Sequence, residues 1–375
     1  MLRINFVGDI NPGGVLAFMG GVTQNVLDCL ADADLRIGTL ESALGDGSKM
    51  CSIKMSNPRN GAIIYSPDES IATLKKLKID IVTLANNHIC DLDAEGLKHT
   101  IEVLRDNGIL FLGAGETIDD ASAPLFITIK GKTICFLAYM EDCVPGIRFA
   151  KVDSAGVNPF NPKQVVCDIK KYRDSCDYLI VMPHWGKENT IWPKLSVIRW
   201  CKMFKDAGAD AIIGSHPHVA QPIVIEGNTV IAPSLGNFLF PDRYINTPRI
   251  TVYPNEEERS KQTIPTVYTY PIVKELTFKV ISDISRVGEI LSINFGDDID
   301  ISLKNKFVLL DKSNTLLMEE PNDDFLDKYA AVLRMLKRPY IFRIVQLSAI
   351  AILLFGKRLY ESERLRNLFH LKIKQ

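Results

Sequence analysis

The sequence predicts an α/β fold whose sheets are covered by helices. Up to Phe240, short apolar runs rich in β-branched residues alternate with stretches that have the apolar spacing of amphipathic helices. Such alternation is typical of α/β folds. The length of 375 residues suits one large domain with an appendage, or two domains. Hydrophobic residues at 46% and charged residues at 24% exclude a chain that is disordered throughout.

The expected strands and helices alternate along this part of the chain. Strands are expected at residues 3–7, 79–84, 125–129, 133–138, 178–183, 211–213 and 229–233. Helices are expected at 71–77, 94–104 and 197–204, where apolar residues recur every three or four positions. Asp93 is the expected N-cap of the second helix, and Gly108 and Gly208 are the expected stops of the second and third.

Beyond Phe240 the composition changes. Residues 242–262 are polar and include the charged run 256–259, so we expect an exposed loop there. Residues 263–280 and 286–295 alternate like strands, and the chain from Glu319 onward has a helical pattern. These features predict a main domain at residues 1–311 and a basic, helical C-terminal extension at residues 312–375.

Charge and cysteine content restrict the expected location and partners. The 44 Lys+Arg and 45 Asp+Glu residues give a net charge of −1, which argues against a non-specific nucleic-acid binder. Met1-Leu2-Arg3 lead directly into a strand pattern without the apolar region of a signal peptide. The eight cysteines form no C-x-x-C pair. We therefore expect a cytoplasmic protein with reduced thiols.

Residues 344–355 form a nearly continuous apolar run with basic residues on both sides. The run is shorter than the ~20 residues that span a bilayer, so we expect a helix packed on the core. The alternative is a basic amphipathic anchor, peripheral to the inner face of the membrane.

Five polar motifs follow expected strands or apolar runs. They are Gly8-Asp9-Ile10-Asn11, Thr39-Leu40-Glu41, Ala85-Asn86-Asn87-His88 with Asp91 close behind, His184-Trp185-Gly186-Lys187-Glu188, and Gly214-Ser215-His216-Pro217-His218. Ligands of α/β sheets bind beyond the carboxyl ends of the strands, so the motifs are expected to share one site. Carboxylate, amide and imidazole ligands together suit Mn, Fe or Zn, and Mg where carboxylates dominate. His99 and His370 lie outside the motifs and are expected to have surface or structural roles.

These motifs, followed by Ser234-Leu235-Gly236-Asn237-Phe238, resemble in their order the CapA family of bacterial capsule and poly-γ-glutamate biosynthesis proteins. The resemblance covers residues 2–240 and extends less clearly to about residue 300. That family is similar to calcineurin-like metallophosphoesterases. The resemblance therefore implies a four-layer αββα sandwich, an α/β (α+β) fold with a dinuclear metal centre, followed here by the C-terminal helical extension.

The resemblance also implies a role for each motif residue. Asn87, His184 and His216 would hold one metal, Asp9 and His218 the other, and Glu41 would bridge the two. His88 would protonate a leaving oxygen. Glu188 is a second expected catalytic residue, and the expected substrate-binding residues are Asn11, Asn86, Asp91, Lys187 and Asn237.

Three positions depart from the phosphoesterase pattern. Asn11 stands where those enzymes have a second ligand histidine, Glu41 replaces an aspartate, and Ile89 stands where an acidic residue is usual. The sequence therefore leaves open whether the site binds one divalent ion or two.

Three functions are compatible with these residues. The first is a CapA-type metal-dependent hydrolase or transferase of capsule or poly-γ-glutamate metabolism. The second is a non-catalytic accessory protein that holds an anionic polymer, a polymer precursor or capsule-synthesis proteins at the membrane surface. The third is a general metallophosphoesterase. An acidic polymer requires basic groups near the site, and Lys187, Arg148 and Lys151 are the candidates.

Overall fold

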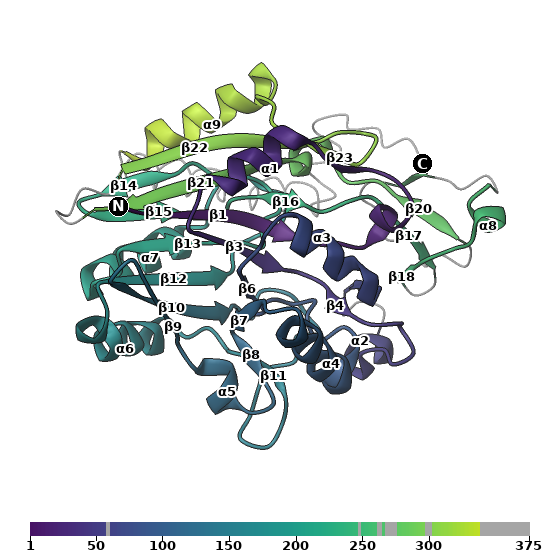
Figure 1. The fold of residues 1–375 in the computed structure, drawn as a ribbon, viewed down its shortest axis with the longest axis horizontal. Helices are drawn as coiled ribbons and strands as arrows, with labels where there is room; N and C mark the ends of the chain where they lie inside the picture. The colour runs from purple at the N-terminus through teal and green to yellow at the C-terminus, as the bar shows by residue number, and fades with distance from the viewer. Residues whose placement is uncertain (58–60, 247–248, 261–264, 267–275, 297–301, 338–375) are drawn as a thin grey trace, which may run out of the picture.

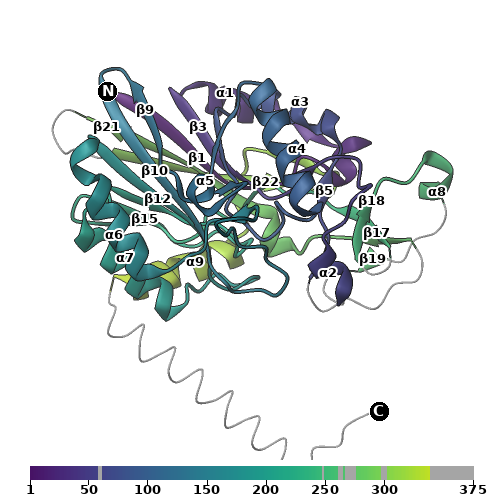
Figure 2. The same cartoon turned by 90° about the horizontal axis from the view of Figure 1, so that it is seen from below.

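A computed structural model describes residues 1–57, 61–246, 249–260, 265–266, 276–296 and 302–337. Two sheets are stacked face to face, and helices cover the outer face of each (Figures 1 and 2). The predicted four-layer α/β sandwich is confirmed by this arrangement.

The larger sheet has nine strands among the described residues. Their order is β2 (Gly21–Val22), β23 (Thr315–Leu317), β22 (Ser302–Leu310), β21 (Val287–Phe295), β1 (Leu2–Ile10), β3 (Leu35–Leu40), β6 (Ile81–Thr83) and β7 (Leu110–Leu112), with β16 (Asn237–Leu239) also paired to β1. Strands β1, β3, β6 and β7 are parallel, as is β16 to β1. Their carboxyl ends therefore open on one edge of the sheet.

The smaller sheet has six strands in the described residues. Their order is β14 (Val224–Glu226), β15 (Thr229–Ala232), β13 (Ala211–Ile213), β12 (Tyr178–His184), β10 (Lys132–Met140) and β9 (Leu125–Ile129). Its central strands β10, β12, β13 and β15 are parallel, and the two edge strands are antiparallel. Both sheets thus bring the ends of parallel strands toward one site.

Alternate residues of the central strands pack into different layers. Phe136 of β10 packs with Phe6 of β1 between the sheets, whereas Leu137 packs with Val165 and Phe204 under the outer helices. Because both faces are covered, the strands are apolar throughout rather than alternating.

The helices flank the sheets as the two outer layers (Figure 2). Helices α1 (Gln24–Ala31), α3 (Ile71–Lys76) and α4 (Asp93–Asp106) lie over the larger sheet, and α6 (Pro162–Tyr172) and α7 (Leu195–Ala207) over the smaller one. The remaining short elements are β4 (Ala43–Leu44), α2 (Ser52–Ser56), β5 (Tyr65–Ser66), β8 (Ala114–Gly115), α5 (Ile118–Ser122) and β11 (Gly156–Val157). The N-cap of α4 is Leu92, so the predicted Asp93 cap is one residue late; the Asp93 carboxylate instead pairs with Arg148.

The prediction of an exposed loop at residues 242–262 is wrong. The chain forms β17 (Arg243–Asn246), β18 (Ile250–Val252) and α8 (Glu256–Ser260), and β17 pairs with β20 (Thr277–Lys279), which pairs with β19 (Pro265–Thr266). The polar pattern misled because two of its charged residues are buried: Asp242 is 2% and Arg243 5% exposed. Of the strand predicted at 263–280, most residues lie outside the described ranges.

The division between residues 1–311 and 312–375 stays a prediction. Strand β23 lies just beyond it and pairs with β22 and β2 of the larger sheet. Helix α9 (Asp323–Leu336) then packs on β22, where Phe325 lies 6.0 Å from Phe307 between ring centres. The apolar run at 344–355 lies outside the described residues. Within the described part of the chain, no helix has both the length and the apolar character needed to cross a membrane.

Candidate metal centre

The predicted metal ligands come together at the carboxyl ends of the parallel strands. Asp9 lies near the end of β1, Glu41 directly follows β3, and His184 ends β12. His216 and His218 follow β13, and Asn87 lies in the loop after β6. All six are buried or nearly so, from 0% exposure of the Asp9, Glu41 and His184 residues to 15% of the His218 side chain.

A close approach of two backbones positions Asp9. Strand β16 pairs with the end of β1, so that Asp9 lies opposite Asn237. A Cβ atom at Gly8 would stand 1.8 Å from the carbonyl oxygen of Gly236, so only glycine fits before Asp9. The Gly-Asp motif is therefore required by packing as well as by the carboxylate that follows.

Asn87, His184 and His216 form one half of the site. Nε2 of His184 lies 2.9 Å from Oδ1 of Asn87 and 3.2 Å from Nδ1 of His216. Nδ1 of His184 lies 2.7 Å from the hydroxyl of Ser215. When that hydroxyl accepts the Nδ1 proton, the lone pair of Nε2 faces the two other ligand atoms, as in metal-bound histidines.

Asp9 and His218 form the other half, and Glu41 lies between the halves. Nδ1 of His218 donates to Oδ1 of Asn237 at 2.8 Å and lies 3.5 Å from Oδ2 of Asp9. Oε1 of Glu41 is 3.6 Å from Nε2 of both His184 and His218. This is the place of a carboxylate that serves both halves.

Two histidines of the site have an unusual backbone. His216 has φ 93° and His218 has φ 55°, values that residues with side chains adopt at a cost. Oδ2 of Asp9 accepts the backbone N–H of His216 at 3.2 Å. The turn at Pro217 therefore holds both imidazoles toward the carboxylates.

The pKa values of the clustered side chains indicate a site that favours a cation. Burial, and for Asp9 also the charge of Glu41, raises the pKa of both carboxyl groups to about 7. Burial lowers the pKa of His218, but Glu41 and Asp9 outweigh it and raise that pKa to about 9. The two carboxyl groups are thus buried close together, and a nearby positive charge would stabilise the ionised form of both.

Unpaired buried oxygens show that these residues fit a divalent ion. Oδ1 of Asp9 and both carboxylate oxygens of Glu41 are buried without a hydrogen-bond partner. Ligand atoms of Glu41, His216 and His218 all lie within 4.8 Å of one another. Buried carboxylates without partners are costly, and a bound cation would satisfy them.

His88 belongs to a second, adjoining network. Its Nδ1 lies 2.6 Å from Oδ2 of Asp91, and Asp91 also accepts the ammonium of Lys54 and the backbone N–H of Ile64. Burial and the charge of Lys54 lower the pKa of His88 well below its usual range, which favours the neutral ring. With Nδ1–H donated to Asp91, its Nε2 remains a hydrogen-bond acceptor. Asp91 thus orients His88 and is itself 0% exposed.

Two residues of the site escaped the sequence analysis. Lys54 is 3% exposed and also donates to the carbonyl of Asn87 at 2.8 Å. Sγ of Cys143 lies 3.3 Å from Nε2 of His216. Neither residue stands in a motif or follows a predicted strand, so the sequence carries no signal for them.

The other predicted residues have different positions. Asn86 bonds to the carbonyl of Leu40 and the N–H groups of His88 and Ile89, and so holds the loop. Oδ1 of Asn11 accepts from the N–H of Gly13 and the hydroxyl of Ser66. Glu188 is half-buried and lines a cavity beside the ligands, whereas Lys187 is exposed and does not line it.

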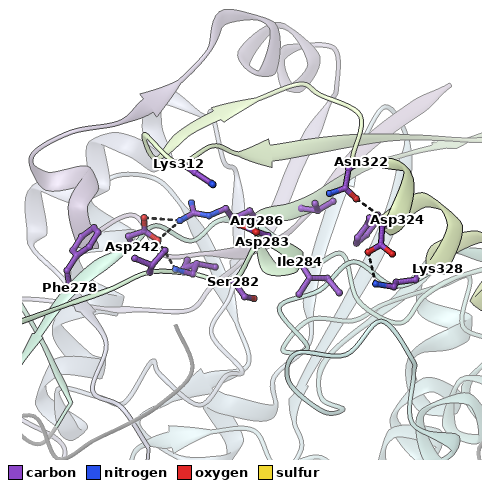
Figure 3. Close-up of a pocket in the computed structure, with 14 residues that line it drawn as sticks. Asp242, Phe278, Ser282, Asp283, Ile284, Arg286, Lys312, Asn322, Asp324 and Lys328 are labelled. Carbon is purple, nitrogen blue, oxygen red and sulfur yellow. Dashed lines mark hydrogen bonds and ion pairs between the residues drawn. The ribbon is translucent and has the colours of Figure 1, made fainter. Parts of the chain in front are cut away.

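That cavity gives access to the cluster and has a volume of about 260 Å³. Asn87, His88, His218 and Asn237 line it together with Lys54, Arg243, Arg249 and Lys279. A larger cavity, of about 730 Å³, lies along residues 278–287 and the start of α9 (Figure 3). Neither the proposed ligands nor His88 line the larger cavity.

One family profile matches the part of the chain that contains the candidate ligands. Residues 3–242 match the profile of the bacterial capsule synthesis protein family, PGA_cap. The chain belongs to this capsule synthesis family. The matched range includes every predicted site residue and ends just before β17.

Two relatives of known capsule function match slightly less than half of the chain. The chain is 34% identical over 181 residues to the PGA biosynthesis protein CapA of Bacillus subtilis and 31% identical over 188 residues to the capsule biosynthesis protein CapA of Bacillus anthracis. These segments cover 48% and 49% of this chain, and 47% and 46% of the relatives. The chain thus matches about half the length of each relative.

Solved structures with similar folds are distant in sequence. A phosphatase of Mycoplasma pneumoniae is 14% identical to this chain, with a TM-score of 0.44. The aligned region covers 87% of this chain and 96% of the phosphatase chain. The NAD nucleotidase of Haemophilus influenzae is 13% identical, with a TM-score of 0.41. The aligned region covers 90% of this chain and 56% of the nucleotidase chain.

Proposed function

We propose that this protein is a metal-dependent hydrolase or transferase of capsule or poly-γ-glutamate biosynthesis that acts on an anionic polymer or its precursor. Membership of the capsule synthesis family supports the process. The observation that carries the catalytic part is the set of buried, unpartnered carboxylate oxygens of Asp9 and Glu41 among three imidazoles.

Six side chains would hold the metal. One ion (Mn, Fe, Zn or Mg) would lie between Asn87, His184 and His216, a second would lie between Asp9 and His218, and Glu41 would serve both. When bound, such ions supply Lewis-acid polarisation and neutralise developing negative charge.

The protein's own groups then position the substrate and move a proton. His88 lines the cavity, and Asp91 would fix its ring by accepting the hydrogen bond from Nδ1–H, so that Nε2 would take a proton from the attacking group and then give it to the leaving oxygen. Lys54 holds the Asn87 backbone and Asp91 together. Glu188 lines the same cavity and would orient substrate groups.

Turnover of two candidate substrates tests the proposal. Protein loaded with Mn or Zn is incubated with γ-linked glutamate oligomers and with an aryl phosphate, beside Asp9→Asn and the surface control His99→Ala. We expect metal-dependent cleavage or transfer of the oligomer that Asp9→Asn abolishes and His99→Ala retains. Cleavage of the aryl phosphate alone would favour a general phosphoesterase. The absence of any metal-dependent turnover would overturn the catalytic proposal.

A non-catalytic accessory role is the second candidate, and one observation favours it. Oδ1 of Asn11 is engaged by Gly13 and Ser66, so the position of the missing ligand histidine is used to shape a turn. The second ion would then have fewer ligands. The accessory role predicts that protein containing one ion binds the glutamate oligomer but does not turn it over.

A further inference from the structure

Strand β10 ends beside the candidate metal centre but carries none of the predicted ligands. The residues that follow it, from Glu141 to Cys143, stand in none of the five polar motifs. Two of them nevertheless contact the segments that carry the ligands His184 and His216. We call Glu141 and Cys143 the supporting pair, and their contacts explain how two imidazoles are aimed at one point.

Glu141 contacts the segment of His184 through both its backbone and its side chain. Its backbone N–H donates to the carbonyl of His184 at 2.9 Å, which continues the parallel pairing of β10 with β12. Its carboxylate accepts the backbone N–H of Gly186 at 2.7 Å and lies 3.7 Å from the ammonium of Lys194. Gly186 has a φ of 99°, so the chain turns sharply just after the ligand. The Glu141 carboxylate therefore holds the turn that follows His184.

Cys143 contacts the ring of His216 on the side that faces away from the other ligands. Its Sγ atom lies 3.3 Å from Nε2 of His216, whereas Nδ1 of the same ring lies 3.2 Å from Nε2 of His184. The backbone N–H of Cys143 donates to the carbonyl of Glu141 at 2.8 Å, and this short turn presents the thiol to the ring. The two nitrogens of His216 thus face different groups, Nδ1 a ligand and Nε2 the thiol.

A hydrogen bond from Nε2–H to Sγ determines which lone pair His216 offers. A neutral imidazole carries one ring proton, so Nδ1 keeps its lone pair when Nε2–H donates to the sulfur of Cys143. The hydroxyl of Ser215, 2.7 Å from Nδ1 of His184, can fix that ring in the corresponding way. The lone pairs of both rings then converge with Oδ1 of Asn87, which lies 2.9 Å from Nε2 of His184. Three acceptors without a donor between them favour a cation.

The opposite direction of this hydrogen bond has a different consequence. If the thiol of Cys143 donated to Nε2, the proton of His216 would lie on Nδ1 and point to Nε2 of His184. The ring of His216 could then not bind a metal through Nδ1. The thiol is therefore useful to a metal site as an acceptor, and this role differs from simple packing.

We propose that Glu141 and Cys143 are positioning residues for the half of the site formed by Asn87, His184 and His216. Cys143 accepts the Nε2–H of His216 and so directs the Nδ1 lone pair to the metal, and Glu141 holds the turn after His184. The inference rests on the proposed function for the presence of a metal, but metal affinity can be measured without turnover.

The affinity of matched variants for Mn²⁺ tests the supporting pair. Full-length metal-free protein is titrated with Mn²⁺, and the free ion is measured by electron paramagnetic resonance. Mn²⁺ is the chosen probe because thiols are poor ligands for it, so an effect of Cys143 must act through His216. Cys143→Ala removes the acceptor and Cys143→Ser replaces it by an oxygen, and Glu141→Ala and Glu141→Gln are the matching variants of the carboxylate. The control is Cys29→Ala, which changes a half-buried thiol on α1 that packs on the core.

We expect Cys143→Ala to weaken the binding of one Mn²⁺ by about 10- to 100-fold, as the loss of a partner of a ligand histidine typically does. Cys143→Ser and Cys29→Ala should bind like the wild type. Glu141→Ala should weaken the same ion, and Glu141→Gln should not, because its amide oxygen can still accept from Gly186. Unchanged affinity in Cys143→Ala and Glu141→Ala, or a loss in Cys143→Ser as large as in Cys143→Ala, would overturn the proposal.

Affinity and turnover separate this inference from the proposed function. Weaker Mn²⁺ binding by Cys143→Ala that Cys143→Ser restores, in a protein without metal-dependent turnover, would support the supporting pair and reject the enzyme. Metal-dependent turnover with unchanged Mn²⁺ affinity in Cys143→Ala would support the enzyme and reject the role of the thiol. A folded wild type that binds no Mn²⁺ would overturn both.

Discussion

The ligand cluster and the small four-stranded sheet of β17, β18, β19 and β20 both contribute side chains to the smaller cavity, but they are built differently. The cluster stands at the ends of parallel strands, in short motifs such as Gly8-Asp9 and His216-Pro217-His218. The small sheet is mixed, since β17 is antiparallel to β18 and β20 while β19 is parallel to β20, and it lies in a segment with polar composition. The difference shows that strand ends gather the candidate metal ligands of this fold, whereas the small sheet adds side chains to the cavity that lies beside them.

The largest expected effect concerns metal removal. A chelator should lower the melting temperature of the wild-type protein markedly at pH 8, because the loss of bound metal removes its stabilisation of the folded state and leaves oxygens of Asp9 and Glu41 buried without a hydrogen-bond partner. Glu41→Gln should lose this response and, without metal, should melt above the chelated wild type. Thermal melting with and without chelator is the measurement. An equal chelator response in both proteins would contradict the role of Glu41.

The next effect concerns the attachment of the small sheet. Asp242 accepts two hydrogen bonds from Arg286 at 2.7 and 2.9 Å, and their side chains are 3% and 4% exposed (Figure 3). Asp242→Ala leaves the buried guanidinium of Arg286 without a carboxylate, with the carbonyls of Leu310 and Asp311 as acceptors, and should cost about 3–5 kcal/mol in urea unfolding. The metal content of the folded fraction should not change.

Asp283→Ala is the control for the Asp242→Ala prediction. Asp283 is an exposed carboxylate that lines the larger cavity, as Asp242 does. A loss of stability in Asp242→Ala no greater than in this control would show that the buried pair does not fix the sheet.

Glu289 separates the effect of burial from that of metal binding. It is fully buried on β21, accepts a hydrogen bond from Asn305 at 3.0 Å, and burial raises its pKa from the usual 4.5 to about 8. Since the unfolded chain ionises first, stability should fall as pH rises from about 4.5 to 8. Glu289→Gln should raise the melting temperature by a few degrees at pH 8 and less at pH 5.

A chelator should leave the Glu289→Gln difference unchanged, because this carboxyl lies away from the ligands. The exposed Glu226→Gln is the matched control. A difference that is the same at both pH values would show that Glu289 is not the group that titrates.

The sequence predicted the layers of the fold and the convergence of the ligand residues. Alternating strands and helices gave the fold class, and motifs at strand ends gave the cluster, because the topology of parallel sheets places strand ends together. The roles of Asp9, Glu41 and the histidines as metal ligands came from the resemblance to the capsule family and not from the spacing of the residues.

The buried charges of the small sheet and Lys54 could not be predicted, for a physical reason. The segment around Arg243 has the composition of an exposed loop, yet Asp242 is buried in an ion pair with the distant Arg286, and Arg243 is buried where β17 pairs with β20. Lys54 is buried by contacts with Asp91 and Asn87 that only the folded chain creates. Composition indicates the cost of burying a charge but not the partner that offsets it.

The most direct test of the central claim is the metal content of the purified protein. Wild type, His216→Ala and the surface control His99→Ala are purified without chelator, supplied with Mn and Zn, and measured by elemental analysis. We expect one or two equivalents in the wild type and in His99→Ala, and a clear loss in a folded His216→Ala. Equal metal content in all three proteins, or no metal in a folded wild type, would contradict it.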